Sequence, residues 1–466
     1  MKTYGLTPDL PVEGDWCVVG SERGAPQEWL VLGSLAEYGH RYRVKFDTTQ
    51  EKVIAVFGKR GQGKSYTLGS LVEPLATRQG ATSIGNTRLE RAVLIFDTLN
   101  IFQWMNVTLV PDLEQDYPEI RRQLGALSGW DISPEPLNVE IWVPAGYRYP
   151  LSSPHFKDFH LSVSDFDIAD WGALLDVDIV RDIKGQFLAE VFEKVVTLGW
   201  TTEEGETVEP QKHYAIEDLV RCIEKDHEYQ DGVFRPETRR AVLQQLKAYQ
   251  RHPVFSGPGT PLTSLLKPGR ASVVLLGRLP PDLRSVLVGT IVRRLVDERA
   301  EASENAKDLA VNPALDEETR RRKREAVESA VPRTWIVIDE AQNVLPSEKK
   351  TSATEALVRL VKEGRNFGLS FVVTTQQPRA LDVRVMSQVE TFVCHKLVSQ
   401  ADIDYLLENL KCPLPTRITD QDVILTPRDL LRDIGVGQAF VSDANTKRCL
   451  LLQVRPRVSV HGGFEA

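Results

Sequence analysis

The feature that most constrains the fold is a glycine-rich loop set between an apolar run and a helix-forming run. Residues 53–57 read Val-Ile-Ala-Val-Phe, residues 58–65 read Gly-Lys-Arg-Gly-Gln-Gly-Lys-Ser, and residues 66–75 carry a helical pattern. Glycines let successive backbone N–H groups turn inward onto a polyphosphate, and the positive end of the following helix faces the same anion. The pattern therefore predicts a phosphate-binding loop. The alternative is a glycine-rich loop that only turns the chain.

The spacing of this loop gives its polar residues predicted parts in nucleotide binding. Lys64 is expected to reach the β and γ phosphates of ATP, and the Ser65 hydroxyl is expected to hold Mg²⁺. The predicted ATP-binding set is Gly58, Lys59, Arg60, Gly61, Gln62, Gly63, Lys64, Ser65 and Tyr66.

Charge and cysteine usage bound the class of protein. The net charge of −8 and the pI of about 5.7 exclude a basic nucleic-acid coat, but a ring or groove can still concentrate positive charge locally. Five widely spaced cysteines without a Cys-x-x-Cys pair argue against a disulfide framework and a structural zinc site, and favour a reducing cytoplasm. The start of the chain lacks a signal-peptide pattern, and no run approaches the apolar length of about 18 residues that a membrane span needs.

Apolar runs separated by helical stretches predict an α/β fold with a mainly parallel, helix-covered sheet. We expect a short β-rich segment over 1–50, a first part of the core over 51–163, an inserted helical subdomain over 164–260, and a second part of the core with the tail over 261–466. The highly charged stretch 299–332 contains Arg320-Arg321-Arg322-Lys323-Arg324. It favours an exposed helix or a mobile arm, and contact with DNA or a partner is the alternative.

A later apolar strand, at 335–338, ends in the acidic pair Asp339 and Glu340. Asp339 is predicted to hold Mg²⁺ through water, and Glu340 to activate the attacking water as a general base. The alternative is that the pair caps a helix. Further along, Gln376 ends the strand at 370–375, where it is expected to sense the γ phosphate or orient water, or to act as a structural amide. Arg365 lies on a loop, from which an arginine can salt-bridge locally or reach a neighbouring subunit.

Taken together, these motifs resemble the HerA branch of the HerA/FtsK superfamily of hexameric P-loop ATPases. The matching segments occur in order as residues 58–65, residues 338–343 (Ile-Asp-Glu-Ala-Gln-Asn), residues 362–368 (Lys-Glu-Gly-Arg-Asn-Phe-Gly) and residues 374–378 (Thr-Thr-Gln-Gln-Pro). The tail segments 437–441, 454–457 and 461–463 are also similar to that family.

The resemblance implies a RecA-like core, a homohexameric ring and ATP-driven translocation of double-stranded DNA. It implies Asp339 and Glu340 as the Walker B pair, Arg365 as an arginine finger acting in trans, and Gln376 as the sensor. Relatives of this kind work with nucleases in end resection, or with nuclease or NAD-consuming effectors in antiviral defence, so such a partner is expected. The rival interpretation is a scaffold in which ATP assembles a ring that regulates an effector without pumping DNA. A packaging or conjugation motor would share the same core.

Some residues depart from the family pattern. About fifty N-terminal residues are few for the family's N-terminal β-barrel, which puts partner docking there in doubt. Gln377 stands where the family usually has Arg, and Gln342 where it usually has His. Asp97 ends the apolar strand predicted at 92–97 and matches a family acid, although capping of the next helix explains it equally well.

Overall fold

A computed structural model of the chain describes residues 12–21, 26–37, 42–113, 117–147, 155–230, 232, 234–410, 412, 414, 418–420 and 423–463. Within these residues, one large mixed sheet has the strand order β1-β2-β4-β3-β20-β19-β16-β5-β15-β14-β8-β13-β9-β10, with β7 paired to β3 and β6 to β7. The predicted α/β fold with a mainly parallel sheet is confirmed.

The half of the sheet from β16 to β10 is entirely parallel. Its strands are β5 (Val53–Phe57), β8 (Ala92–Asp97), β9 (Val139–Pro144), β10 (Phe156–Phe159), β13 (Ala271–Leu275), β14 (Thr334–Ile338), β15 (Leu369–Thr375) and β16 (Thr391–Cys394). The carboxyl ends of parallel strands meet at one edge of a sheet, so the loops that follow these strands gather there.

The N-terminal strands extend the same sheet, which confirms the predicted β-rich N-terminal flank. Strand β3 pairs antiparallel with both β4 and β20, and β20 with β19. The bounds in this half and in the small hairpins are β1 (Val12–Glu13), β2 (Trp16–Val19), β3 (Trp29–Leu35), β4 (Arg43–Asp47), β6 (Ala81–Thr82), β7 (Gly85–Asn86), β17 (Ile418–Asp420), β18 (Val423–Leu425), β19 (Gln438–Asp443) and β20 (Arg448–Val454).

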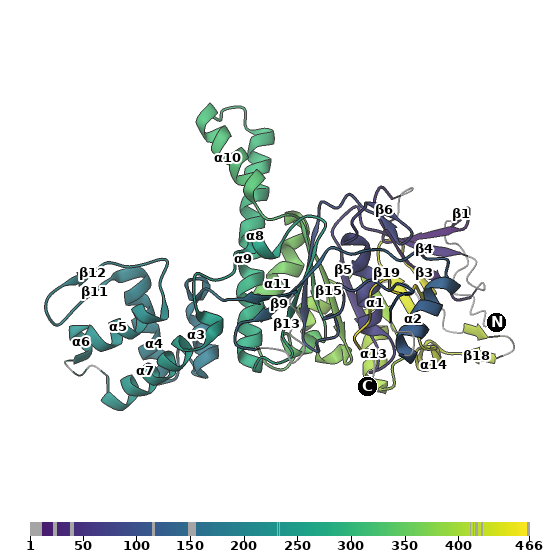
Figure 1. Cartoon of the computed structure of the whole chain (residues 1–466). Helices are drawn as coiled ribbons and strands as arrows, with labels where there is room; N and C mark the ends of the chain where they lie inside the picture. The colour runs from purple at the N-terminus through teal and green to yellow at the C-terminus, as the bar shows by residue number, and fades with distance from the viewer. Residues whose placement is uncertain are drawn as a thin grey trace.

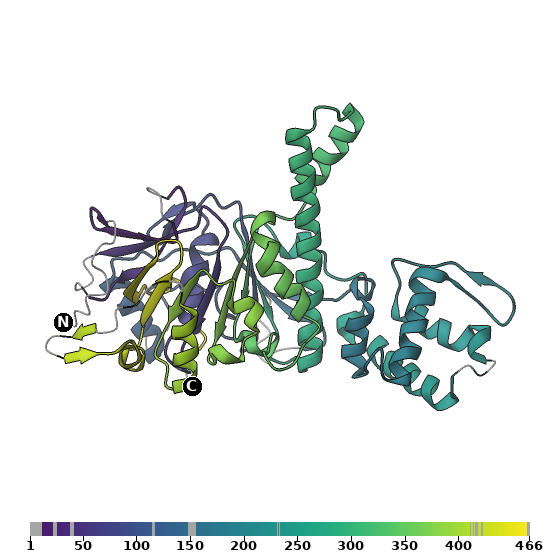
Figure 2. The same ribbon diagram turned by 180° about the vertical axis from the view of Figure 1, so that it is seen from behind.

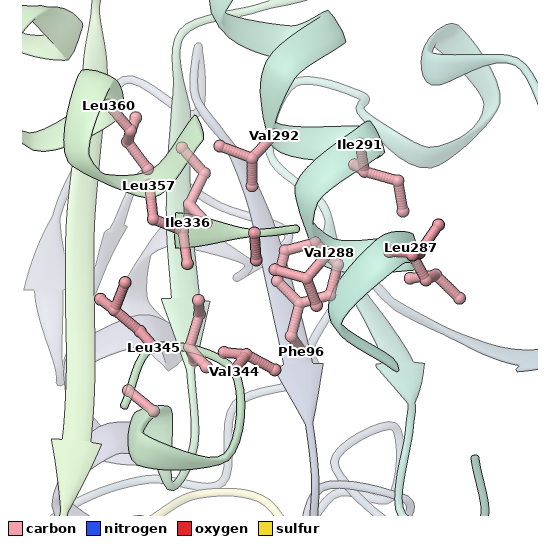
Figure 3. Close-up of a cluster of buried hydrophobic side chains, with 14 of the residues drawn as sticks. Phe96, Leu287, Val288, Ile291, Val292, Ile336, Val344, Leu345, Leu357 and Leu360 are labelled. Carbon is pink, nitrogen blue, oxygen red and sulfur yellow. The ribbon is translucent and has the colours of Figure 1, made fainter. Parts of the chain in front are cut away.

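Alternating side chains of the central strands feed two cores, one on each face of the sheet. Phe96 and Ile336 belong to the face covered by α9 (Pro281–Val311) and α11 (Thr354–Glu363), where they meet Val288, Leu357 and their neighbours (Figure 3). Trp335 and Val337 point to the other face, which α1 (Lys64–Val72) covers. Because these strands are buried on both faces, they read as continuous apolar runs.

Helices between β10 and β13 form a lobe beside the sheet (Figure 1). They are α3 (Ile168–Leu175), α4 (Ile183–Glu193), α5 (Ile216–Lys225), α6 (His227–Gln230) and α7 (Pro236–Gln250), with the hairpin β11 (Trp200–Thr201) and β12 (Thr207–Val208). The short helix α8 (Leu262–Leu265) lies outside this lobe, beside α9 and the sheet. Salt bridges from Arg293 to Asp167 and Asp170 join the start of the lobe to α9.

Helix α9 continues past the sheet and turns back as α10 (Glu317–Ser329), so the pair projects from the molecule (Figures 1 and 2). Lys323 faces α9, 3.1 Å from Asp308. None of the residues of α10 is buried. Its outward face carries acids and bases together, namely Glu317, Glu318, Arg321, Arg322, Arg324, Glu325 and Glu328. Opposite charges three or four residues apart on a helix attract and partly neutralise one another.

The remaining helices are α2 (Pro118–Gly129), α12 (Val383–Met386), α13 (Gln400–Asn409) and α14 (Pro427–Asp433). The helix expected over 66–75 differs from the structure at its ends, because it is α1 plus a short 3₁₀ helix at Glu73–Leu75. Helix α4 ends in a π-helical turn at Lys194–Leu198.

No disulfide framework was expected, but Cys412 and Cys449 form one disulfide. These residues are 37 positions apart, and only the return of β20 brings them together. The other cysteines (Cys17, Cys222 and Cys394) are buried and free. Among the described residues, no helix combines the length and the apolar character needed to cross a membrane.

Candidate functional site

The glycine loop joins the carboxyl end of β5 to the start of α1, as the sequence predicts. Gly63 caps α1 with a φ of 104°, a left-handed conformation that favours glycine. At Gly58, where φ is 155°, an added Cβ would lie 2.7 Å from Cβ of His395. Glycine is therefore required at residue 58 for space as well as for conformation.

His395 supports this loop, although no sequence motif singles it out. It follows β16, the neighbour of β5, and is fully buried, which lowers its pKa to about 4. Nδ1 lies 2.7 Å from the Gln438 carbonyl and Nε2 lies 2.8 Å from Oγ1 of Thr67. A carbonyl only accepts, so Nδ1 carries the proton and the Thr67 hydroxyl donates to Nε2. The neutral ring thus ties α1 to the strand beside it.

The other end of α1 is fixed by a buried cluster of charges. Glu73 accepts from Nη1 of Arg455 at 3.0 Å and from Nε of Arg457 at 3.1 Å, and also from Ser459 and the backbone of Val458. Burial alone would raise the pKa of Glu73, but the two guanidinium groups hold it below its ordinary value. The helix that starts at the phosphate loop is therefore anchored at both of its ends.

Asp339 follows β14 at the edge where the glycine loop lies. The Ser65 hydroxyl donates to its two carboxylate oxygens at 3.2 and 3.3 Å, and the Thr374 hydroxyl donates at 2.5 Å. Burial, helped by the nearby Asp97 carboxylate, raises the pKa of Asp339 to about 7. A hydroxyl and a carboxylate at this distance are oxygen donors of the kind Mg²⁺ prefers. Ser65 and Asp339 therefore fit the predicted metal-binding role.

Glu340 accepts hydrogen bonds on both of its carboxylate oxygens. Nζ of Lys64 lies 3.3 Å from Oε1, and the Gln376 amide donates to the same oxygen at 2.9 Å. The Gln342 amide donates to Oε2 at 2.8 Å. The Glu340 side chain does not cap the 3₁₀ helix that follows it, so the helix-cap interpretation fails for this residue.

Gln376 and Gln342 thus lie on either side of the same carboxylate. Gln376 follows β15 as predicted, and its contact with Glu340 places it in the site. Gln342 stood out in the sequence only as a departure from the family pattern. Gln377 makes backbone contacts with Thr375 and no contact with Glu340 among the described hydrogen bonds.

Asp97 ends β8 and is fully buried next to Asp339. It accepts from the backbone of Leu99 at 3.1 Å and of Phe102 at 2.7 Å. Burial raises its pKa to about 6. Asp97 therefore fixes an irregular turn, rather than the helix that the sequence suggested.

Arg365 is not brought together with the other predicted residues within one subunit. It lies just before β15, whereas Gln376 lies just after it, and seven residues at about 3.3 Å each separate the two by roughly 23 Å. Arg365 donates to Glu390 and to Gln50, both at 2.9 Å, and its side chain is 53% exposed. These partners precede β16 and β5, so the arginine belongs to the opposite edge of the sheet.

The site combines a strand, a glycine loop with Lys64 and Ser65, and an acidic pair on a parallel strand two positions away in the sheet. Together these features define a P-loop ATPase. The family model for the central domain of the helicase HerA matches residues 30–295, more than half of the 466 residues. The chain belongs to the HerA family.

Curated relatives include the DNA double-strand break repair helicases HerA of Pyrococcus furiosus and Saccharolobus solfataricus. The first is 25% identical over 234 residues, which cover 47% of this chain and 39% of the relative. The second is 26% identical over 161 residues, covering 34% and 28%. The matched region thus spans less than two fifths of the length of either relative.

Similar solved structures include VirB4 of Thermoanaerobacter pseudethanolicus, with a TM-score of 0.48 and 14% identity over 93% of this chain and 98% of that one. The bacterial conjugative coupling protein TrwB has a TM-score of 0.47 and 12% identity, over 96% and 93%. Similarities this low carry no argument about function or assembly.

Proposed function

We propose that this protein hydrolyses ATP with Mg²⁺ as a homohexameric ring and uses the energy to translocate double-stranded DNA. One observation carries the proposal: Lys64, Ser65, Asp339, Glu340 and Gln376 converge at the carboxyl edge of β5, β14 and β15. Lys64 binds the β and γ phosphates, and the loop N–H groups with the start of α1 bind the remaining charge. Ser65 and Asp339 hold Mg²⁺, which supplies positive charge to the phosphates when bound.

Glu340 is the general base of this proposal. Its carboxylate is buried beside Lys64, so it takes the proton of a water molecule directly next to the phosphate-binding loop. Gln376 holds the carboxylate in place through its amide hydrogen. In the structure Lys64 and Glu340 pair with each other, so phosphate binding must draw Lys64 away before the carboxylate can act.

A ring explains Arg365 better than a single subunit does. The residue is exposed and lies at the sheet edge opposite its own phosphate loop, so it reaches a nucleotide only when another subunit presents one. An arginine supplied in trans is worth about 10³–10⁵ in rate. In this interpretation, the local salt bridge to Glu390 fixes the position of the Arg365 guanidinium.

DNA is proposed as the substrate because relatives of this chain are named as DNA repair helicases. Tracking of a phosphate backbone needs few basic groups per subunit when six copies act together, so the net charge of −8 is compatible. A nuclease or NAD-consuming partner in antiviral defence remains part of the proposal. It rests on the sequence resemblance alone.

The test is steady-state ATP hydrolysis by the purified chain with and without linear duplex DNA, with the oligomeric mass measured in parallel. A hexamer whose turnover rises with duplex DNA, and falls again with added salt, is the expected result. A hexamer that hydrolyses ATP but ignores DNA would replace the motor with a scaffold that regulates a partner. Absence of hydrolysis under all conditions would remove the catalytic assignment.

A further inference from the structure

One polar atom in the site is left unused by the pairings described above. Oε1 of Gln342 is buried and has no hydrogen-bond partner among the described residues. The side chain belongs to the 3₁₀ helix Ala341–Asn343, directly after Glu340. A buried amide carbonyl without a partner is uncommon, because burial removes its hydrogen bond to water.

The orientation of this amide is fixed by its neighbour. An ionised carboxylate only accepts hydrogen bonds, so the amide nitrogen of Gln342 must face Oε2 of Glu340. Exchange of the amide nitrogen and oxygen would place two acceptors 2.8 Å apart. The free carbonyl oxygen therefore lies beside the carboxylate of the proposed base.

We propose that Gln342 is a catalytic residue that orients the attacking water, an inference that rests on the proposed ATP hydrolysis. The water has two hydrogens, of which Glu340 takes one. The other hydrogen needs an acceptor at a fixed place, and the Gln342 carbonyl supplies it. In the step, an oxygen lone pair of water forms the bond to the γ phosphorus. The bond from phosphorus to the bridging oxygen breaks with its electron pair on ADP, and the proton ends on Glu340.

The distribution of donors on Glu340 favours Gln342 over Gln376 for this part. Oε1 already receives both Lys64 and Gln376, whereas Oε2 receives only Gln342 among the residues that the structure describes. Oε2 therefore keeps more free acceptor capacity for a water proton. The Gln376 carbonyl is not among the buried oxygens that lack a partner. We assign Gln376 to positioning of the carboxylate, and Gln342 to the water.

The experiment compares Gln342→Met with Gln342→His in the full chain, with Mg²⁺ and ATP. Methionine keeps the length of the side chain but has neither the N–H donor nor the carbonyl acceptor. Neutral histidine keeps one donor and one acceptor. Gln388→Met is the matched control, because Gln388 is exposed and its side chain contacts only Ser387 among the described hydrogen bonds. Readouts are kcat, KM, the Kd of a fluorescent ATP analogue and Tm.

The expected result is a kcat ~10- to 100-fold lower for Gln342→Met, with Kd and Tm as in wild type and a partial recovery in Gln342→His. A kcat within about twofold of wild type for Gln342→Met would overturn the inference while leaving the proposed function intact. A parallel loss of Kd, Tm and kcat would also overturn it, because the side chain would then only hold the fold. Absence of hydrolysis in wild type would overturn both proposals.

Discussion

Nζ of Lys64 lies 3.3 Å from Oε1 of Glu340, and the two side chains are only 5% and 3% exposed. The cation assigned to the phosphates thus neutralises the carboxylate assigned to the water. A buried ion pair is stable only while both charges have partners. When a nucleotide binds, Lys64 must therefore exchange Glu340 for the phosphates. This exchange frees the Glu340 carboxylate to act as the base.

Replacement of Glu340 by Gln is expected to separate ATP binding from turnover. The shape of the side chain stays, but the proton acceptor is lost, so kcat should fall by ~10²- to 10⁴-fold. ATP binding, measured with a fluorescent analogue, should remain. Lys64→Ala should instead abolish binding.

Glu363→Gln is the control for this comparison, because Glu363 is exposed at the end of α11 and its side chain pairs, within the described part of the chain, only with Arg359. Rapid turnover by Glu340→Gln would remove the general-base assignment.

Arg365→Ala is expected to abolish hydrolysis without harming the fold. The side chain is about half exposed, and exposed ion pairs contribute only about 0–1 kcal/mol to stability. Circular dichroism and Tm check the fold. Glu390→Gln, which keeps the arginine but removes its charged partner, should cost much less activity.

Mixed rings test whether Arg365 acts in trans. Subunits with Arg365→Ala keep a complete phosphate loop, and subunits with Lys64→Ala keep the arginine. An equal mixture should recover part of the activity that each lacks. If rings of both subunits form, which mass measurement shows, and no activity returns, the trans assignment loses its support.

Removal of His395 is expected to change how stability depends on pH. The folded-state pKa of His395 is about 4 and the ordinary value about 6.5, so the unfolded chain binds more protons between these pH values. The contribution of this group to the free energy of unfolding is present above pH 6.5. It falls by up to about 3 kcal/mol as the pH is lowered to 4. His395→Asn keeps a donor near Nδ1 and has no titrating group.

Urea unfolding at pH 7.5 and pH 5 should show a smaller loss of stability for His395→Asn than for wild type. The comparison uses the difference between the proteins because Asp97, whose pKa is raised to about 6, acts with the opposite sign in both. Equal pH dependence in the two proteins would mean that the ring is accessible to water.

Glu73→Ala is expected to destabilise the protein strongly. It leaves the fully buried guanidinium groups of Arg455 and Arg457 without their carboxylate, and such a loss typically costs about 3–5 kcal/mol. Chemical denaturation measures the change. The triple variant Glu73→Leu, Arg455→Met and Arg457→Met should be less destabilised than Glu73→Ala alone, because it leaves no buried charge without a partner. A loss below about 1 kcal/mol in Glu73→Ala would show that the cluster is solvated.

The sequence predicts the parts of the site that depend on local order. The glycine loop follows from Gly58, Gly63 and Lys64 at fixed spacing, and the acidic pair follows from an apolar strand that ends in Asp339 and Glu340. These patterns carry their own physical reason, because a phosphate needs converging N–H groups and a metal needs oxygen ligands at a strand end. Most of the buried strands were also predictable, as both faces of the sheet are covered.

Residues whose partners come from distant strands were not predictable in the same way. His395 and Thr67 are 328 positions apart, and Glu73 and Arg455 are 382 apart. Their contacts depend on the strand order, which the spacing of apolar residues does not encode. The disulfide between Cys412 and Cys449 escaped prediction for the same reason. The exact bounds of α4 and α9 depended on tertiary packing and local capping, which periodicity describes poorly.

The position of β5 in the sheet has a consequence for biosynthesis. Both of its neighbours, β15 and β16, come from residues beyond 368, so this apolar strand leaves the ribosome with neither edge paired. Translation at about 5–20 residues per second separates such segments by roughly 20–60 s. During that interval the nascent chain exposes a strand capable of pairing with other chains. The phosphate loop that follows β5 is therefore made well before the two strands that flank β5, so chaperone demand should fall on this segment of the nascent chain.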